Sequence, residues 1–194
     1  MTRYTDIQLD ALRELANIGS GKASGALSSM LGRSVDITVP SASVLPMAEA
    51  VGTIGEPEAE YTGVVLGVVG EMPASVLLLF TPRDAELICG MLGVESGTEI
   101  GVSALMEIGN IVGTSYINAL CEMTGMDLEP APPAAATDML GAIVQTVLAE
   151  RAGASDSALL LDSDLVVERE DCSVSFLLVP DAGGVELMLG RLGL

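Results

Sequence analysis

The sequence predicts an α+β fold built from two copies of one unit. The first observation is an internal repeat. When the chain is shifted by 93 residues, segment 5–32 falls on segment 98–125 with 11 identities in 28 positions. The second is that helical and strand patterns do not alternate regularly, as they would in a doubly wound fold. We therefore expect one domain, 1–194, with repeats at about 1–97 and 98–194. Two copies are too few for a solenoid, so a pseudo-twofold single domain is favoured.

Each repeat opens with a pattern that predicts a long amphipathic helix. Thr5 and Thr98 are N-cap candidates, and an acidic residue follows each of them, where a helix start favours negative charge. Gly32 and Gly125 suit the C-caps, because glycine readily adopts the left-handed conformation. The two helices should therefore end at about residues 31 and 123.

Strands and shorter helices are expected after each long helix. Alternating or β-branched segments predict strands at 35–39, 62–69, 75–81, 158–168 and 173–179. Further helices are expected at about 83–92, at about 181–192 and, as an apolar helix extra to the second repeat, at 138–153. The Pro-rich or acidic segments 40–60 and 130–137 are predicted to be surface loops.

Charge and hydropathy indicate a soluble, cytoplasmic protein. The formal net charge is −19, with one Lys and seven Arg, and this field repels nucleic acid and anionic membranes. No apolar run approaches the roughly 20 residues that span a bilayer, and the polar N-terminus does not resemble a signal peptide. The acidic, Lys-poor composition suggests a halophilic source, such as a halophilic archaeon. Attraction to a basic partner is the alternative reading of the same charge.

The missing residue types exclude several classes of enzyme. The chain has no His, which removes His-based triads and most zinc catalysis, and it has no phosphate-binding glycine loop. The three Cys are isolated in sequence, so a disulfide framework is not expected, and Cys89 and Cys121 are read as core residues. We therefore expect no cofactor and no metal site in this chain.

A repeated Glu-x-x-Asn pattern marks the exposed face of each long helix. With Asp10 at zero and about 100° per residue, Glu14 falls at about 40° and Asn17 at about −20°. Ser24 and Ser28 fall near this line, and Gly21 and Gly113 are small residues that leave room for another molecule. The first helix should bury the opposite side: Leu12, Leu15, Ala16, Gly19, Ala23, Ala26 and Met30. In the second helix Ser103, Glu107, Asn110 and Thr114 form the same exposed line, opposite Leu105, Ile108, Val112, Tyr116, Ala119 and Met123.

The asparagines make this face a candidate site. A solvated helix face explains Glu, but Asn destabilises a helix relative to Ala, and two of the three Asn in the chain occupy equivalent positions. An amide can orient a water, and a solvated carboxylate can pair with a Lys of another protein. These groups suit assisted phosphoryl hydrolysis in a site completed by a partner. Glycoside chemistry with paired carboxylates fits less well, because each site offers one acid.

These motifs resemble the CheC family of chemotaxis phosphatases, which is related to CheX and to the flagellar switch phosphatase FliY. The family pattern Asp/Ser-x-x-x-Glu-x-x-Asn stands here as Asp10–Glu14–Asn17 and Ser103–Glu107–Asn110, with Ala16 where the family often has Gly. The resemblance implies two long antiparallel helices packed on one face of a largely antiparallel sheet, with a pseudo-twofold repeat.

The resemblance also implies a reaction and partners. The reaction is dephosphorylation of the phosphoaspartate of CheY-type response regulators. Asn17 and Asn110 would orient the attacking water, Glu14 and Glu107 would pair with the active-site Lys of the regulator, and the regulator would hold Mg²⁺. The deamidase CheD is an implied second partner, for which 138–153 and the following Asp156 region are the candidate surface, although an ordinary core helix explains this segment equally well.

Two other functions stay open at this stage. The same faces could sequester phosphorylated regulator or CheD without turnover, as a non-catalytic binding module. A purely structural part of a flagellar switch is less favoured, because 194 residues leave no room for the additional domain of FliY-type proteins.

Overall fold

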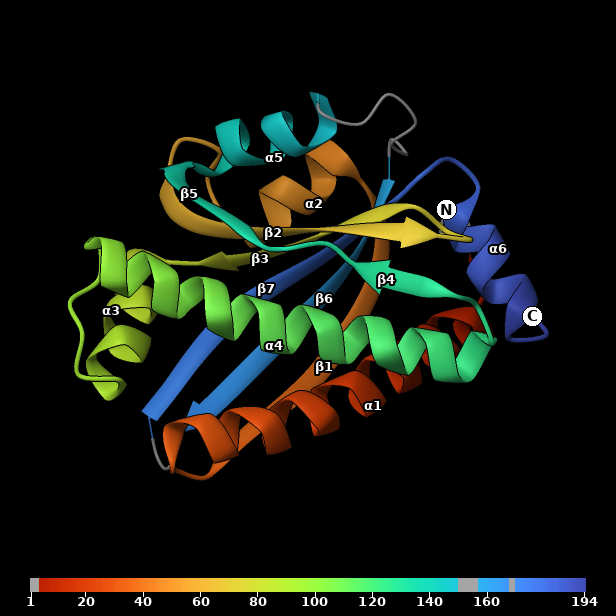
Figure 1. Ribbon diagram of the computed structural model, residues 1–194. Coiled ribbons are helices and arrows are strands. Elements are labelled where there is room, and N and C mark those ends of the chain that lie inside the picture. Colours follow the sequence, from red (N-terminus) through yellow and green to blue (C-terminus); the bar gives the residue numbers. More distant parts are fainter. Residues whose placement is uncertain (1–3, 150–156, 168–169) are drawn as a thin grey trace.

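The computed structural model describes residues 4–149, 157–167 and 170–194 and confirms the α+β fold (Figure 1). The helices are α1 Asp6–Leu31, α2 Met47–Ile54, α3 Pro82–Met91, α4 Glu99–Thr124, α5 Leu140–Ala149 and α6 Gly184–Arg191. The strands are β1 Val35–Pro46, β2 Glu60–Gly70, β3 Ala74–Phe80, β4 Leu128–Pro130, β5 Ala134–Met139, β6 Ser157–Val167 and β7 Glu170–Pro180.

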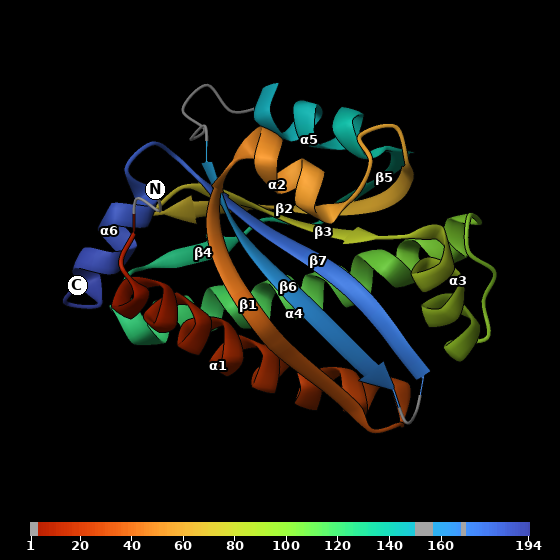
Figure 2. The ribbon, with the colours of Figure 1, turned by 180° about the vertical axis from the view of Figure 1, so that it is seen from behind.

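One antiparallel sheet separates two layers of helices. Its strand order within the described residues is β1-β6-β7-β3-β2-β4, and β5 also pairs with β2. The long helices α1 and α4 run in opposite directions on one face, and α2 and α5 cover the other face (Figures 1 and 2). Every residue of the central strand β3 is buried, because both of its faces are covered by helices.

The ends of α1 and α4 confirm the predicted caps. The Thr5 hydroxyl accepts a hydrogen bond from the Gln8 backbone N–H at 3.3 Å, and the Thr98 hydroxyl accepts one from the Gly101 backbone N–H at 3.1 Å. Each helix has 26 residues and ends on a glycine with positive φ, 63° at position 32 and 68° at position 125. The two helices therefore begin and end at equivalent positions, 93 residues apart.

The remaining elements follow the same equivalence. The strand at each edge of the sheet order, β1 or β4, follows one of the long helices. Next to it lie the two strands of a hairpin, β6 and β7 beside β1, and β2 and β3 beside β4, so that β7 pairs with β3 at the centre. In the central pair Leu78 lies opposite Phe176, and these two residues are equivalent in the matched segments 75–82 and 173–180. A twofold axis between two copies requires this kind of pairing, and the register supports the predicted repeats.

Two predicted loops were wrong. Segment 40–60 contains the second half of β1 and the helix α2, and segment 130–137 contains most of β5. Prolines gave the loop signal in both segments. In segment 40–60, one proline lies where the β1–β6 register shifts, between Thr38 and Ser41, and another directly precedes α2. In β5 pairing with β2 overrides the weak strand propensity of alanine.

The helix predicted at 138–153 is α5, but it is not extra to the second repeat. It begins 93 residues after α2, so the first repeat has its own shorter counterpart. Residues 150–153 and Asp156 lie outside the described residues. The buried face of α5 packs on the far side of the sheet through Leu140, Ile143, Val144 and Val147.

Two serines of α1 were assigned to its exposed line, and this placement was wrong. The hydroxyl of Ser24 accepts a hydrogen bond from the Ile37 backbone N–H at 2.9 Å, and that of Ser28 accepts one from the Val35 N–H at 2.9 Å. Both donors belong to the edge strand β1, which has β6 as its strand partner on one side only. The serines therefore cover an edge that would otherwise leave N–H groups unpaired.

The helix α4 is the element on which the expectation about membranes depends. Among the described residues it is the one helix long and apolar enough to cross a bilayer by length and composition, with a mean hydropathy of 1.2 over its best window. In that window 44% is buried inside the protein, so somewhat less than half of it is accounted for by packing. A single helix of this kind is weak support for a membrane span and is typical of the core helix of a soluble protein.

Gly25 offers a test of the description of α1. It is exposed in the helix interior, and a Cβ built on it meets no atom within 4 Å. We expect Gly25→Ala to raise the free energy of unfolding by about 0.5–1 kcal/mol, because alanine loses less backbone entropy in a helix. Denaturant unfolding measures this change. Gly32→Ala is the control with the opposite sign, because its φ of 63° strains any side chain; a gain in stability there would contradict the described C-cap.

Candidate active site on two helix faces

The outer face of α1 carries the first Glu–Asn pair. Glu14 and Asn17 are both exposed, and Leu12, Leu15 and Ala16 are buried on the opposite side. The predicted inward face of α1 is wrong in part toward the C-terminus of the helix. Ala26 was predicted to be buried but is exposed, and Met30 is only half-buried, whereas Ser20 and Leu27 are buried although they were not predicted to be. The pair itself lies where the sequence predicted it, facing solvent.

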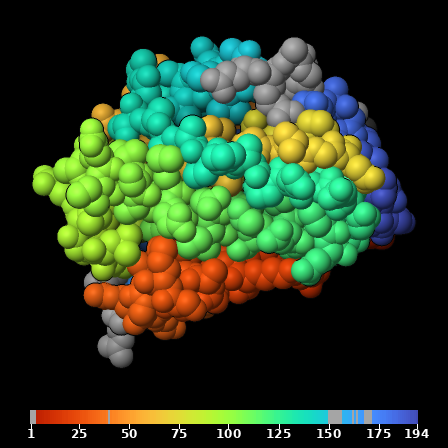
Figure 3. Space-filling model, in the orientation of Figure 1, coloured from red at the N-terminus to blue at the C-terminus, as the bar shows by residue number. Residues whose placement is uncertain are grey.

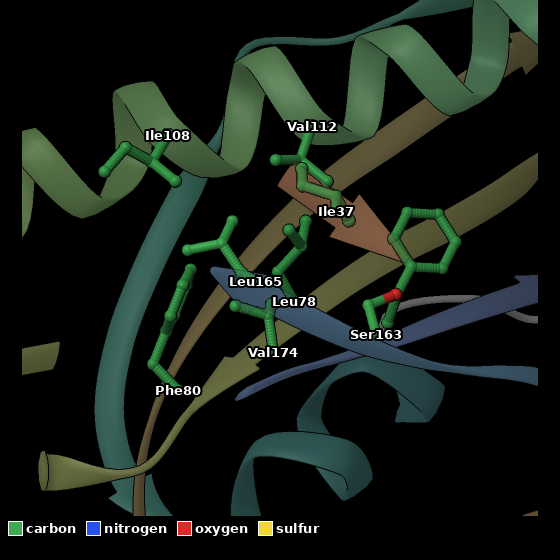
Figure 4. Close-up of a pocket in the computed structure, with 9 residues that line it drawn as sticks. Ile37, Leu78, Phe80, Ile108, Val112, Ser163, Leu165 and Val174 are labelled. Carbon is green, nitrogen blue, oxygen red and sulfur yellow. The ribbon is translucent and has the colours of Figure 1, made fainter. Parts of the chain in front are cut away.

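The outer face of α4 carries the second pair. Glu107 is exposed and Asn110 is half-buried. On the inner side Ile108 and Val112 point from α4 toward Leu78, Phe80, Leu165 and Val174 of the sheet (Figure 4). The inward residues predicted for α4 are buried, except that Met123 is only half-buried. Burial of one side of α4 thus fixes the direction in which Glu107 and Asn110 point.

Glycines bring the two helices close to the sheet and to each other. A Cβ on Gly109 would lie 2.6 Å from Val64 Cγ1, and one on Gly113 would lie 3.2 Å from Leu66 Cδ1. Gly113 is buried, so the expectation that it leaves room for another molecule was wrong. A Cβ on Gly19 would lie 2.9 Å from the Tyr116 ring, which places α1 directly against α4. These close contacts fix the positions of both helices against the sheet and against each other.

Tyr116 anchors the shared inner side of the two helices. Its ring packs on Phe176 with the ring centroids 4.4 Å apart. Burial raises the pKa of Tyr116 to about 12, so its hydroxyl stays neutral at physiological pH.

The two pairs have different neighbours. In the first site Asp10 forms an ion pair with Arg13 at 2.8 Å, and Gly21 leaves open space around its Cα. In the second site the Thr114 hydroxyl donates a hydrogen bond to Asn110 Oδ1 at 3.4 Å. Sequence reasoning missed the Arg13 contact, although an acid and a base three residues apart on a helix are the signal for it.

The two outer faces lie side by side on the surface of the molecule (Figure 3). An ion pair between Lys22 of α1 and Glu122 of α4 joins the two helices. Within the described part of the chain, no side-chain partner is recorded for Glu14, Asn17 or Glu107. These three groups are therefore available to another molecule.

Two cavities among the described residues lie away from the Glu–Asn pairs. A small apolar cavity of about 10 Å³, the space of about one water, lies between α4 and the sheet. A groove of about 190 Å³ lies beside α5 on the far face of the sheet and is lined by residues such as Val65, Ala135 and Ile143. Neither is lined by the Glu–Asn pairs, and no group of three metal-ligating side chains occurs among the described residues. Each pair thus lies on exposed helix surface, a shape suited to entering a pocket of a partner.

Each of the two long helices therefore presents an acid and an amide on its outer side. The sequence model of the CheC-like family matches residues 7–44 and 100–136, which contain both pairs. The model thus matches one segment in each half of the chain, and this match agrees with the resemblance inferred from the two motifs.

Two relatives are similar to the chain in sequence, and one solved structure is similar to it in fold. The chain is 29% identical over 196 residues to the CheY-P phosphatase CheC of Bacillus subtilis, covering 96% of this chain and 94% of the relative. It is 28% identical over 136 residues to the flagellar motor switch phosphatase FliY of Bacillus subtilis, covering 66% of this chain and 35% of that protein. The crystal structure of Thermotoga maritima FliY has the same fold, with a TM-score of 0.76 at 21% identity, covering 99% of this chain and 98% of that one.

Proposed function

We propose that this protein is a phosphatase of phosphorylated CheY-type response regulators in chemotaxis signalling. The observation that carries the proposal is the pair of equivalent helix faces on which Glu14, Asn17, Glu107 and Asn110 point outward. The similarity to a CheY-P phosphatase along nearly the whole chain supports the substrate class.

The amides and the carboxylates have different roles in this proposal. Asn17 or Asn110 enters the active site of the regulator and orients a water for in-line attack on the phosphoaspartate. Glu14 or Glu107 pairs with a lysine beside that phosphoaspartate and fixes the docked geometry. The regulator holds Mg²⁺ and supplies charge stabilisation, so this chain contributes positioning alone. The asparagine can do this without titrating, because an amide is neutral across the physiological pH range.

The surroundings of the pairs support this role. A water-orienting amide must be held in place, and the contacts of Gly19 and Gly109 fix both helices. Gly21 leaves open space in the same line as Asn17, so another backbone can approach closely. In the second site Thr114 donates to Oδ1 of Asn110, so this hydrogen bond does not use the amide N–H groups of Asn110.

The remaining parts of the proposal concern partners and location. CheD is proposed as a second partner, at α5 and the groove beside it, where the outer residues of α5 are exposed. A cytoplasmic location follows from the substrate class, since response regulators act in the cytoplasm. No nucleic acid or membrane insertion is involved, in keeping with the net charge of −19.

Turnover separates this function from a non-catalytic binding module. A response regulator carrying a labelled phosphoryl group is mixed with about one-tenth as much of this protein, and release of phosphate is followed. We expect the decay to be faster than that of the regulator alone and to proceed through several turnovers. Decay at the spontaneous rate, together with retention of the phosphorylated regulator on the immobilised protein, would leave sequestration as the function.

A further inference from the structure

Two exposed isoleucines occupy equivalent positions at the starts of the long helices. Ile7 and Ile100 are each 69% exposed, which makes them the most exposed large apolar side chains among the described residues. Each is the second residue of its helix, two positions after the capping threonine. One exposed apolar side chain is ordinary on a protein surface, but the same residue at the same exposure in both repeats needs an explanation.

The fold does not supply this explanation. Neither isoleucine packs against the hydrophobic cores, although the nearby Tyr4 and Leu9 do. A hydrophobic staple would use the residues before the N-cap and at the fourth helical position, and in α1 these are Tyr4 and Leu9. Isoleucine is also a poorer helix former than the Leu, Lys or Glu that a surface position admits. Both positions therefore carry an apolar group that the isolated protein does not use.

Both isoleucines extend the line of the Glu–Asn pairs. In α1 the line is Ile7, Asp10, Glu14, Asn17 and Gly21, and in α4 it is Ile100, Ser103, Glu107, Asn110 and Thr114. These spacings of three and four residues place all members of a line on one side of a helix. Seven residues separate the isoleucine from the glutamate, which corresponds to about 10 Å along the helix axis. An interface that covers Glu14 and Asn17 extends over this distance, because specific protein interfaces involve about 20 residues on each side.

We infer that Ile7 and Ile100 are the apolar anchors of the two docking surfaces, each buried against the response regulator when the adjacent Glu–Asn pair enters its active site. This inference rests on the proposed phosphatase function and adds a requirement for the partner. The regulator must present an apolar patch about 10 Å from the lysine that pairs with the glutamate. The carboxylates attract a cationic group and the amide acts on the reaction, whereas the isoleucine adds affinity by removing apolar surface from water.

Steady-state kinetics of single-site proteins test the inference. Asn110→Ala confines turnover to the α1 site, and in that background we expect Ile7→Ser to raise KM about tenfold with kcat unchanged, as loss of one buried isoleucine at an interface would. Ile100→Ser in the Asn17→Ala background should do the same for the α4 site. Serine has nearly the helix propensity of isoleucine, so the free energy of unfolding should not change.

Val69→Ser is the matched control. Val69 is 55% exposed on β2 and lies outside both lines, so its replacement should leave KM and kcat as they are. Titration of the regulator as its stable beryllofluoride adduct gives the dissociation constant without turnover, and this value should rise with KM. The isoleucine variants could instead keep the KM and dissociation constant of the single-site proteins, Asn110→Ala and Asn17→Ala, while these proteins still turn over. That result would overturn the proposed anchor role of the isoleucines and leave the phosphatase function intact. If wild-type protein shows no turnover, the proposed function fails at the first step.

Discussion

Asn17→Ala combined with Asn110→Ala should reduce the acceleration of phosphoregulator decay by at least about 100-fold, to the rate of the regulator alone. The reason is that each amide is proposed to position the attacking water, and loss of one positioned hydrogen-bond donor costs about that factor in enzymes. Each single variant should keep part of the activity, because the other helix face stays intact. The measurement is multiple-turnover release of labelled phosphate.

The free energy of unfolding of the same double variant should rise although its activity falls. Asn17 is exposed and Asn110 is half-buried, so their replacement opens no core cavity. Alanine is the better helix former, and the free energy of unfolding should rise by about 0.5 kcal/mol per site. Loss of activity in a protein that is at least as stable as the wild type cannot be attributed to misfolding.

Asn118→Ala supplies the matched control for this experiment. Asn118 is the third asparagine of the chain, is exposed, and lies on α4 two turns beyond Asn110. Its replacement makes the same chemical change on the same helix and should leave the phosphatase rate unaltered. A double variant that still turns over at the wild-type rate, or a control that loses the activity, would show that the Glu-x-x-Asn positions are not the reacting ones.

The long helices could be predicted closely because their signals are local. Thr5, Thr98, Gly32 and Gly125 act on the backbone within one turn, so the caps fix both ends without knowledge of the fold. The exposure of the Glu–Asn pairs could be predicted for the same reason, since helical periodicity depends on spacing alone. The equivalence of the two helices also followed from the sequence, because the repeat keeps a constant shift of 93 residues there.

Elements that depend on neighbours in space were less predictable. The strand β5 is rich in alanine and exists because β2 offers it a partner, and nothing within residues 134–139 indicates that partner. The roles of Ser24 and Ser28 depend on the unpaired edge of β1. The buried side of α1 turns toward β1 along the helix. The prediction assumed one fixed inward direction, so it wrongly included Ala26 among the buried residues and left out Leu27. A helix that packs against two neighbours buries a wider part of its circumference, and the spacing of apolar residues in the sequence does not define how wide that part is.

Gly109 connects the packing of α4 to its site, and its replacement should destabilise the protein strongly. It is buried between Glu107 and Asn110 in the sequence, and a Cβ there would lie 2.6 Å from Val64 Cγ1 and 2.9 Å from Val64 Cβ. Val64 is fully buried in β2 and has no room to withdraw. We expect Gly109→Val to lower the free energy of unfolding by about 3 kcal/mol, because overpacking of a rigid core exceeds the gain in helix propensity. Denaturant unfolding with an unchanged m value measures it.

A double-mutant cycle identifies the clash as the cause. Val64→Ala alone should destabilise by about 2 kcal/mol through the cavity that it leaves, and Gly109→Ala alone by about 1 kcal/mol through the clash. Combined, the new methyl group of residue 109 no longer meets the Cγ1 and Cγ2 atoms of residue 64 and fills part of the space that they vacate, whereas the contact with the Cβ of residue 64 remains. The double variant should therefore be at least about 0.5 kcal/mol more stable than the sum of the single changes predicts. Additive losses would mean that α4 is not seated on Val64, and the direction in which Glu107 and Asn110 point would then lose its structural basis.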